Sequence, residues 1–350
     1  MKRFIKAIAI AAIPLGTLTA CDPPIPLAVL VAEAEKVVSC ETGELSVAFD
    51  DGFADLGLSW QQTLEPACAD MKFNQVLIGE EADLYISATL APRCEAFARV
   101  PVAVDAAVVT FYLDEAFTMN LSGSTIDGIL SGTITSWDDP AILSDNPDMT
   151  PISLPINVVP TSSSALINSM EAWSSRLSGE EVVFDALVAD DAANLLDVAF
   201  TMTNGDVALL PYSVAAVSGS TFANVLAGPD PIMDAVLPEF ATMYAGKTQF
   251  EKVSSDLGYE LALNPELEPQ PEDGSLQASP PYQAVVPVMM DLCGEDTTLK
   301  RTLARYFLRL DAQGIVATST VLGLTEYLRI ESAAVVSEGL VLPTPATIEE

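Results

Sequence analysis

Short runs of apolar and β-branched residues alternate with longer helical stretches along most of this chain. The runs fall at 45–49, 73–78, 84–87, 100–109 and 156–159. Strands that alternate with helices form a sheet that those helices cover, so the pattern predicts an α/β fold. The chain has 350 residues, 50% of them hydrophobic, which is enough to bury one large core or two modest ones, and two fit the pattern better. We therefore expect two α/β lobes.

The first residues of the chain have the order of an export signal. Three basic residues precede an apolar run at 7–15, which is too short to span a bilayer. The next motif, Leu18-Thr19-Ala20-Cys21, resembles the lipobox of bacterial lipoproteins, whose cysteine receives a diacylglycerol. We predict that 1–20 is a lipoprotein signal peptide, that Cys21 is lipidated, and that 21–39 is a tether to the outer face of the cytoplasmic membrane. The alternative is a plain secretory signal.

The charge of the chain restricts its partners. The formal net charge is -34 at pH 7, which disfavours binding to nucleic acid and to anionic lipid headgroups. We therefore expect contact with the membrane through the lipid anchor only, and no nucleic-acid partner. The chain has no histidine and no closely spaced thiolates, so the usual ligands of zinc are missing. We expect neither a bound metal nor a cofactor.

Four further cysteines indicate disulfide bonds. An even number of cysteines in an exported chain favours two bonds, and four cysteines allow three connectivities. We predict that Cys40 pairs with Cys68 and that Cys94 pairs with Cys293.

Residues 101–160 carry motifs in an order that is typical of one protein family. An apolar strand at 104–109 is followed by Leu121-Ser122-Gly123. The segment 132–142 then reads Gly-x-Ile-x-x-Trp-Asp-Asp-Pro-Ala-Ile. The serine of the first motif can cap a helix, and the first glycine of the second can end it. In order and spacing, these motifs resemble the phosphate-binding proteins of ABC importers.

Weaker similarity to the same family extends toward the C-terminus. Residues 204–212 resemble its Gly-Ala-Ile-Gly-Tyr-x-x-Tyr strand, although two glycines are replaced. Residues 280–289 are similar to its returning strand, and the helices that end at 323–324 are similar to its last helix pair. The resemblance therefore covers most of 45–335.

This resemblance implies a type II periplasmic binding protein, in which two α/β lobes are joined by two crossing hinge strands. Lobe 1 would comprise 40–104 and 284–350, and lobe 2 would comprise 105–283. All four paired cysteines would then lie in lobe 1, so the disulfides would leave the hinge free to bend. The cleft between the lobes would hold a small solute, an oxyanion or another compound, for delivery to an ABC permease.

The first loops of the implied site differ from the family pattern. Where the family has a Gly-Ser-Gly-Thr-like turn that binds phosphate, this chain has Asp50, Asp51 and Gly52. A carboxylate about 4 Å from an anion costs about 1 kcal/mol in water and about 4 kcal/mol at an effective dielectric near 20. The second ligand loop is missing between 78 and 84, and the third keeps Ser87 but has alanine in place of the family's aspartate. The resemblance therefore implies a site altered against phosphate.

The fourth loop keeps hydroxyl groups but loses its cation. The family reads His-Arg-Ser-Asp-Gly-Ser-Gly-Thr, and here Thr161 stands in the place of the arginine. Thr161, Ser162, Ser163 and Ser164 are candidates to bind an oxyanion or a hydroxylated solute, and the alternative is a helix N-cap. The two carboxylates of the first loop likewise either bind a cation or an amine, or cap the first helix.

The sequence argues against an enzymatic function. A Ser-His-Asp triad is impossible without histidine, and the chain has no Gly-x-Ser-x-Gly motif and no Ser-x-x-Lys motif. We expect no catalytic residues. Two functions remain open: a lipid-anchored extracytoplasmic solute-binding protein of a phosphate-type ABC importer, and a surface interaction lipoprotein that has the same fold but does not transport.

Overall fold

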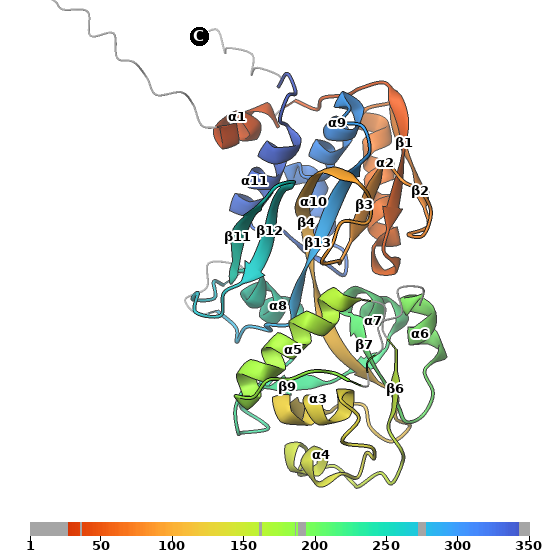
Figure 1. Ribbon diagram of the computed structural model, residues 1–350, viewed down its shortest axis with the longest axis vertical. Coiled ribbons are helices and arrows are strands. Elements are labelled where there is room, and N and C mark those ends of the chain that lie inside the picture. Colours follow the sequence, from red (N-terminus) through yellow and green to blue (C-terminus); the bar gives the residue numbers. More distant parts are fainter. Residues whose placement is uncertain are drawn as a thin grey trace, which may run out of the picture.

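The computed structural model has two lobes connected by long strands (Figure 1). It describes residues 27–35, 37–160, 163–185, 187, 194–271 and 278–342. The predicted signal peptide and Cys21 lie outside the described residues, as do Thr161 and Ser162. In the part of the chain that is described, no helix is both long enough and apolar enough to cross a membrane.

Lobe 1 is the upper lobe in Figure 1, and a mixed sheet forms its centre. The strand order is β11-β12-β4-β13-β3-β1-β2, in which β1 runs parallel to β2 and β3. β13 runs antiparallel to both β3 and β4. The strands are β1 (Gly43–Phe49), β2 (Met71–Val76), β3 (Leu84–Ser87), β4 (Ala96–Phe111), β11 (Phe250–Ser255), β12 (Gly258–Leu263), β13 (Val285–Cys293) and β14 (Leu322–Gly323).

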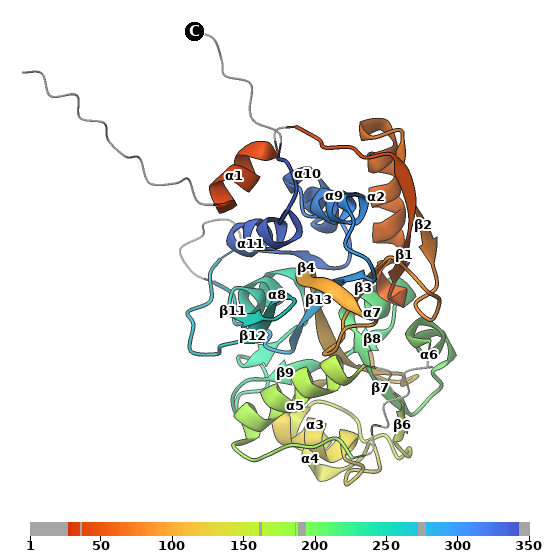
Figure 2. The same ribbon diagram turned by 45° about the horizontal axis from the view of Figure 1, so that its top comes forward.

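Helices cover the sheet of lobe 1. They gather above the sheet in Figure 2, where α9, α10, α11 and α2 lie together. The helices are α1 (Leu27–Ala34), the 3-10 turn η1 (Asp51–Phe53), α2 (Ala54–Ala67), α8 (Phe240–Lys247), α9 (Thr298–Phe307), α10 (Leu310–Val316) and α11 (Glu326–Val336).

Strand β4 belongs to both lobes. Its first part pairs with β13, and its last part, from Ala107 to Phe111, pairs with β7 of lobe 2. Every residue of β4 from Ala98 onward is buried, which explains why valine and alanine predominate in it and polar residues do not alternate with them. β4 and β13 are the two strands that the sequence predicts to cross between the lobes.

Lobe 2 contains a small extension of the main sheet and a second, three-stranded sheet of order β10-β9-β5. Its strands are β5 (Asn120–Ser122), β6 (Asn157–Val159), β7 (Asp206–Pro211), β8 (Thr221–Phe222), β9 (Asn224–Leu226) and β10 (Ala235–Val236). Its helices are α3 (Gly123–Leu130), α4 (Pro140–Asp145), α5 (Ser164–Ser178), α6 (Leu195–Thr201) and α7 (Tyr212–Ser218).

The motifs at 121–142 form one compact unit of lobe 2. The Ser122 hydroxyl accepts a hydrogen bond from the Thr125 N–H at the start of α3, and Gly132 follows the helix with a φ of +80°. Trp137 is fully buried, and its indole N–H donates to the Gly205 carbonyl at 3.1 Å. The cap, the glycine and the tryptophan therefore fix the path of the chain between α3 and β6.

Two segments lie differently from the predicted boundaries. Helix α8 and the hairpin of β11 and β12 fall within the 105–283 expected for lobe 2, yet α8 packs against β13 and β14, and Gly258 pairs with Arg99 in the sheet of lobe 1. Part of the predicted tether at 21–39 is the helix α1, which buries Val31 and packs against α11. Glu35 then forms an ion pair with Arg329, which attaches the end of this segment to lobe 1.

Both predicted disulfides are present. Cys40 pairs with Cys68, which joins the segment before β1 to the end of α2. Cys94 pairs with Cys293, which joins the loop before β4 to the end of β13. Both bonds lie in lobe 1, and the second lies at the start of β4 and the end of β13.

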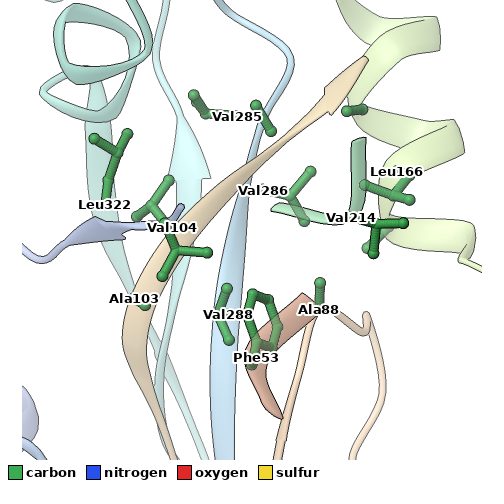
Figure 3. Close-up of a cluster of buried hydrophobic side chains, with 14 of the residues drawn as sticks. Phe53, Ala88, Ala103, Val104, Leu166, Val214, Val285, Val286, Val288 and Leu322 are labelled. Atoms are coloured by element: carbon green, nitrogen blue, oxygen red, sulfur yellow. The ribbon is translucent and has the colours of Figure 1, made fainter. Parts of the chain in front are cut away.

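The hydrophobic core is continuous from one lobe to the other. Figure 3 shows Phe53 and Ala88 of lobe 1 near Leu166 and Val214 of lobe 2, with Val286 of β13 beside them. All five side chains are buried. The lobes therefore meet over an apolar contact, and the polar residues of the cleft lie at its edge.

Candidate functional site

A small cavity lies where the lobes meet. Its volume is about 50 Å³, which is well below the 300–1,000 Å³ of typical sites for drug-sized ligands. Lobe 1 contributes η1 and the loop after β3, and lobe 2 contributes the starts of α5, α6 and α7. The polar lining residues are Asp50, Asp51, Arg93, Ser163 and Ser213. The cavity is large enough for a small solute or a few waters only.

Asp50 follows β1 directly and lies inside the cleft. Its Oδ2 accepts the Ala88 N–H at 2.8 Å, and its Oδ1 lies 3.6 Å from Nη2 of Arg93. Burial raises the pKa of Asp50 to about 6, against the opposing effects of the Arg93 charge and the Ala88 hydrogen bond. Asp51 and Asp105 raise it further. This carboxyl is therefore only partly ionised near pH 6.

Asp51 reaches from lobe 1 to lobe 2. Its Oδ2 accepts the N–H of Leu195, the first residue of α6, at 2.9 Å. Neither Asp50 nor Asp51 caps the helix that follows them, because η1 has no side-chain cap and both carboxylates bond elsewhere. The alternative that they cap the first helix is therefore wrong.

Gly52 is needed for the lobes to approach each other. A Cβ atom at this position would lie 2.0 Å from the Ser213 hydroxyl and 2.8 Å from its Cβ. Any larger side chain would push η1 away from α7. The need for close approach to Ser213 therefore explains the glycine at position 52, and no contact between Gly52 and a solute is required.

The hydroxyl residues that the sequence predicts are only partly brought together. Ser163 is the N-cap of α5, and its hydroxyl donates to the Ala88 carbonyl across the cleft at 3.0 Å. Ser164 is exposed in the first turn of α5, and Ser87 is buried beside Thr89, so neither lines the cavity. Of the described members of this group, Ser163 alone faces the cleft.

Asp105 lies directly behind the cleft, bonded to the lining residue Ser213, and the sequence reasoning missed it. It lies on β4, is 2% exposed, and accepts hydrogen bonds from the Ser213 hydroxyl at 2.6 Å and the Ser213 N–H at 3.2 Å. Burial raises the pKa of Asp105 to about 6, although these bonds oppose the shift. A single aspartate between the apolar residues at 100–104 and 106–109 was the signal that could have found it, because an isolated buried acid needs a specific partner.

Arg93 is the second residue that the sequence reasoning missed, and a buried ion pair holds its loop. Asp291 of β13 accepts the Arg93 N–H at 2.8 Å and bonds Nη1 of Arg99 at 2.8 Å. Asp291 is 0% exposed and Arg99 is 2% exposed. Burial raises the pKa of Asp291, and the Arg99 charge opposes this shift. The pair therefore fixes the position from which Arg93 meets Asp50.

The cleft has more negative than positive groups. Asp50 and Asp51 line it, Asp105 lies behind the lining residue Ser213, and Arg93 is the guanidinium among its described lining residues. No cluster of three or more acidic or cysteine side chains is placed to hold a metal ion within the described ranges. The arrangement supplies mostly acceptors, together with the hydroxyls of Ser163 and Ser213.

The sequence matches no family model and no curated protein. Solved structures, however, share the fold. A phosphate-binding protein from Stenotrophomonas maltophilia has 14% identity and a TM-score of 0.53, with coverage of 83% of this chain and 93% of that one.

Two further structures agree. A protein from Clostridium perfringens, described as a phosphate ABC transporter substrate-binding protein with bound phosphate, has 12% identity and a TM-score of 0.52, and the match covers 81% of this chain and all of that one. The high-affinity periplasmic phosphate-binding protein PfluDING, also bound with phosphate, has 13% identity and a TM-score of 0.51, with coverage of 82% and 92%. The fold of this chain is therefore that of the type II periplasmic phosphate-binding proteins.

Proposed function

We propose that this protein is a lipid-anchored extracytoplasmic solute-binding protein of a phosphate-type ABC importer, and that its cleft does not hold phosphate in the family's usual manner. Cys21 would carry the lipid, and an ABC permease would receive the solute. The shared fold and the two strands that cross between the lobes support the receptor role. The acidic residues that line the cleft support a ligand other than phosphate.

One observation carries the proposal about the ligand: two carboxylates and one guanidinium line the cavity, and a third carboxylate, Asp105, holds the Ser213 of its wall. An anion placed here would lie beside Asp50 and Asp51, with Asp105 behind Ser213, and would have Arg93 as its only positively charged partner among the described lining residues. Repulsion between like charges is strong in such a partly dry site. A small solute that donates hydrogen bonds or carries positive charge fits these acceptors better, and the volume of about 50 Å³ limits its size.

A thermal-shift screen tests this proposal. The chain with Cys21→Ser, which cannot be lipidated, is melted at pH 7.5 with phosphate, sulfate, small amines and small polyols. A solute that binds the folded state stabilises it by about 2.7 kcal/mol at one hundred times its Kd. We expect an amine or a polyol to raise the melting temperature, and Asp50→Asn to abolish the effect. A rise with phosphate that disappears in Ser163→Ala would show that the family's ligand is retained.

The lipid anchor and the permease need their own test. Membranes from cells that produce the wild-type chain should retain it after a salt wash, and those from cells with Cys21→Ser should release it. Mass spectrometry of the N-terminus would identify the acyl chains. A wild-type chain that is released with an unmodified Cys21 would indicate the plain secretory signal.

A second function is favoured by the direct contacts between the lobes. Asp51 bonds Leu195 and Ser163 bonds Ala88, and both bonds cross the cleft. A protein held in this way can serve as a rigid interaction lipoprotein that does not transport. If no solute of the screen shifts the melting temperature at any pH from 5 to 8, this second function is the better one.

A further inference from the structure

A groove with exposed apolar side chains lies in lobe 2, away from the cleft. Its volume is about 530 Å³, and it shares no lining residue with the cleft cavity. It is formed by the loop between β4 and β5, the loop after α4 and the loop between β9 and β10. In Figure 1, α4 lies at the end of lobe 2 that is opposite to α1.

Three large apolar side chains at the groove point to solvent. Phe117 is 78% exposed and Ile232 is 82% exposed, and both line the groove. Met233, which follows in the same loop, is 79% exposed. Single exposed apolar residues are common, but a group around a groove is typical of a protein interaction site. Methionine adapts its shape to varied partners, which suits such a site.

The loops that carry these side chains are held firmly in place. The Asp230 carboxylate accepts the N–H groups of Ile232 at 2.9 Å and Met233 at 3.1 Å, and these bonds lower the pKa of Asp230. Asn120 joins the three loops: its amide donates to the Pro231 carbonyl, and its backbone exchanges hydrogen bonds with the Asn146 side chain. The apolar side chains are therefore presented by an ordered scaffold, which lowers the entropy lost on binding.

The charge around the groove selects the kind of partner. Residues 100–246 contain 19 acidic residues and one basic residue, Arg176. Glu115 and Asp148 are exposed at the groove itself, and none of its described lining residues is basic. A second copy of this chain would bring an equally negative surface, and an anionic lipid surface would also be repelled. A partner with positive charge is attracted instead.

We propose that this groove binds a segment of a partner protein that carries lysine or arginine beside apolar side chains. The apolar side chains of the segment contact Phe117 and Ile232, and its cations face Glu115 and Asp148. The proposal does not depend on which solute enters the cleft, because the groove has a separate set of residues. It assigns lobe 2 a docking surface in addition to its part of the cleft.

Three labelled 12-residue peptides test the proposal by fluorescence anisotropy with the Cys21→Ser chain. The first alternates lysine and leucine, the second has glutamate in place of lysine, and the third has serine in place of leucine. We expect the lysine–leucine peptide alone to bind, and Phe117→Ser or Ile232→Ser to weaken it at least tenfold. Glu115→Gln with Asp148→Asn should weaken it most at low salt, because added salt screens exposed charges.

Matched variants separate this groove from the rest of the acidic surface. Leu77 is 74% exposed in lobe 1, and Glu181 is exposed in lobe 2, so Leu77→Ser and Glu181→Gln remove an apolar group and a charge elsewhere. Both should bind the peptide like the wild type. Equal binding of the lysine–serine peptide, or equal loss in Leu77→Ser, would overturn the proposal.

Two further outcomes would assign the groove to another occupant. Light scattering that shows a wild-type dimer, but a monomer for Ile232→Ser, would make the face a contact between copies of this chain. Binding to vesicles of anionic phosphatidylglycerol that is lost in Ile232→Ser would make it a lipid contact. Either result overturns the proposal.

Discussion

Asp105 offers a stringent test of the electrostatics of the cleft. Its carboxyl is buried on β4, and burial raises its pKa from 3.8 to about 6. The folded state therefore binds the proton of this group more tightly than the unfolded state does. The resulting stability is complete below about pH 4, where both states are protonated. It is lost as the pH rises through 6, because the folded chain must then keep a charge in a poorly solvated place.

The size of the effect follows from the two pKa values. Between pH 5.0 and pH 7.5, a group with pKa values of 3.8 unfolded and about 6 folded lowers the free energy of unfolding by about 1.4 kcal/mol. The chain has no histidine, so no imidazole titrates in this window. Asp105→Asn keeps an oxygen that can accept the Ser213 hydrogen bond but removes the ionisation.

Urea denaturation at pH 5.0, 6.0 and 7.5 measures the effect through the fluorescence of the three tryptophans, which are all buried. We expect the stability of Asp105→Asn relative to the wild type to rise by about 1.4 kcal/mol across this range. Asp256→Asn, at an exposed position, makes the same change in net charge and should show no such trend. Parallel profiles for Asp105→Asn and the wild type would refute the assignment of a raised pKa to Asp105.

Three further changes test one contact between the lobes and two bonds within lobe 1. Gly52→Val should cost about 1–3 kcal/mol of stability and increase the radius of gyration in X-ray scattering, because its Cβ has no room. Gly79→Val, with no atom within 4 Å of the added Cβ, should leave both values unchanged. Cys94→Ser opens a loop of 199 residues, and Cys40→Ser opens one of 28. In urea denaturation, the first should lower the free energy of unfolding by about 5 kcal/mol and the second by about 3.5 kcal/mol. Equal losses would contradict the chain-entropy account. Asp291→Asn leaves a buried guanidinium without its carboxylate and should cost about 3–5 kcal/mol in the same assay.

The sequence predicts the scaffold better than the cleft. The apolar runs at 45–49, 84–87 and 100–109 fall on β1, β3 and β4. Buried strands need apolar residues at successive positions, so the local sequence is enough to predict them. The sequence wrongly assigns the hairpin of β11 and β12 to lobe 2. Its true position in lobe 1 depends on pairing with β4, which is far away in the sequence. Such pairing leaves no local pattern.

The cleft shows the same division. The resemblance to the phosphate-binding proteins implies Asp50, Asp51 and Ser163 as site residues, and all three line the cavity. Arg93 has no comparable signal, because a disulfide and the ion pair of Asp291 bring its loop to the cleft. Whether these residues bind a solute stays a prediction.

The continuity of β4 links the cleft to any movement of the lobes. Asp105 of β4 pairs with Val286 of β13 in the sheet of lobe 1. Two residues later, Ala107 of β4 pairs with Pro211 of β7 in lobe 2. A strand without a break takes up rotation as twist, so swinging one lobe turns the peptide that carries this carboxylate. The carboxylate that accepts the Ser213 hydrogen bond therefore lies on the strand about which the lobes would rotate. A compound that displaces Ser213 would act directly on that strand.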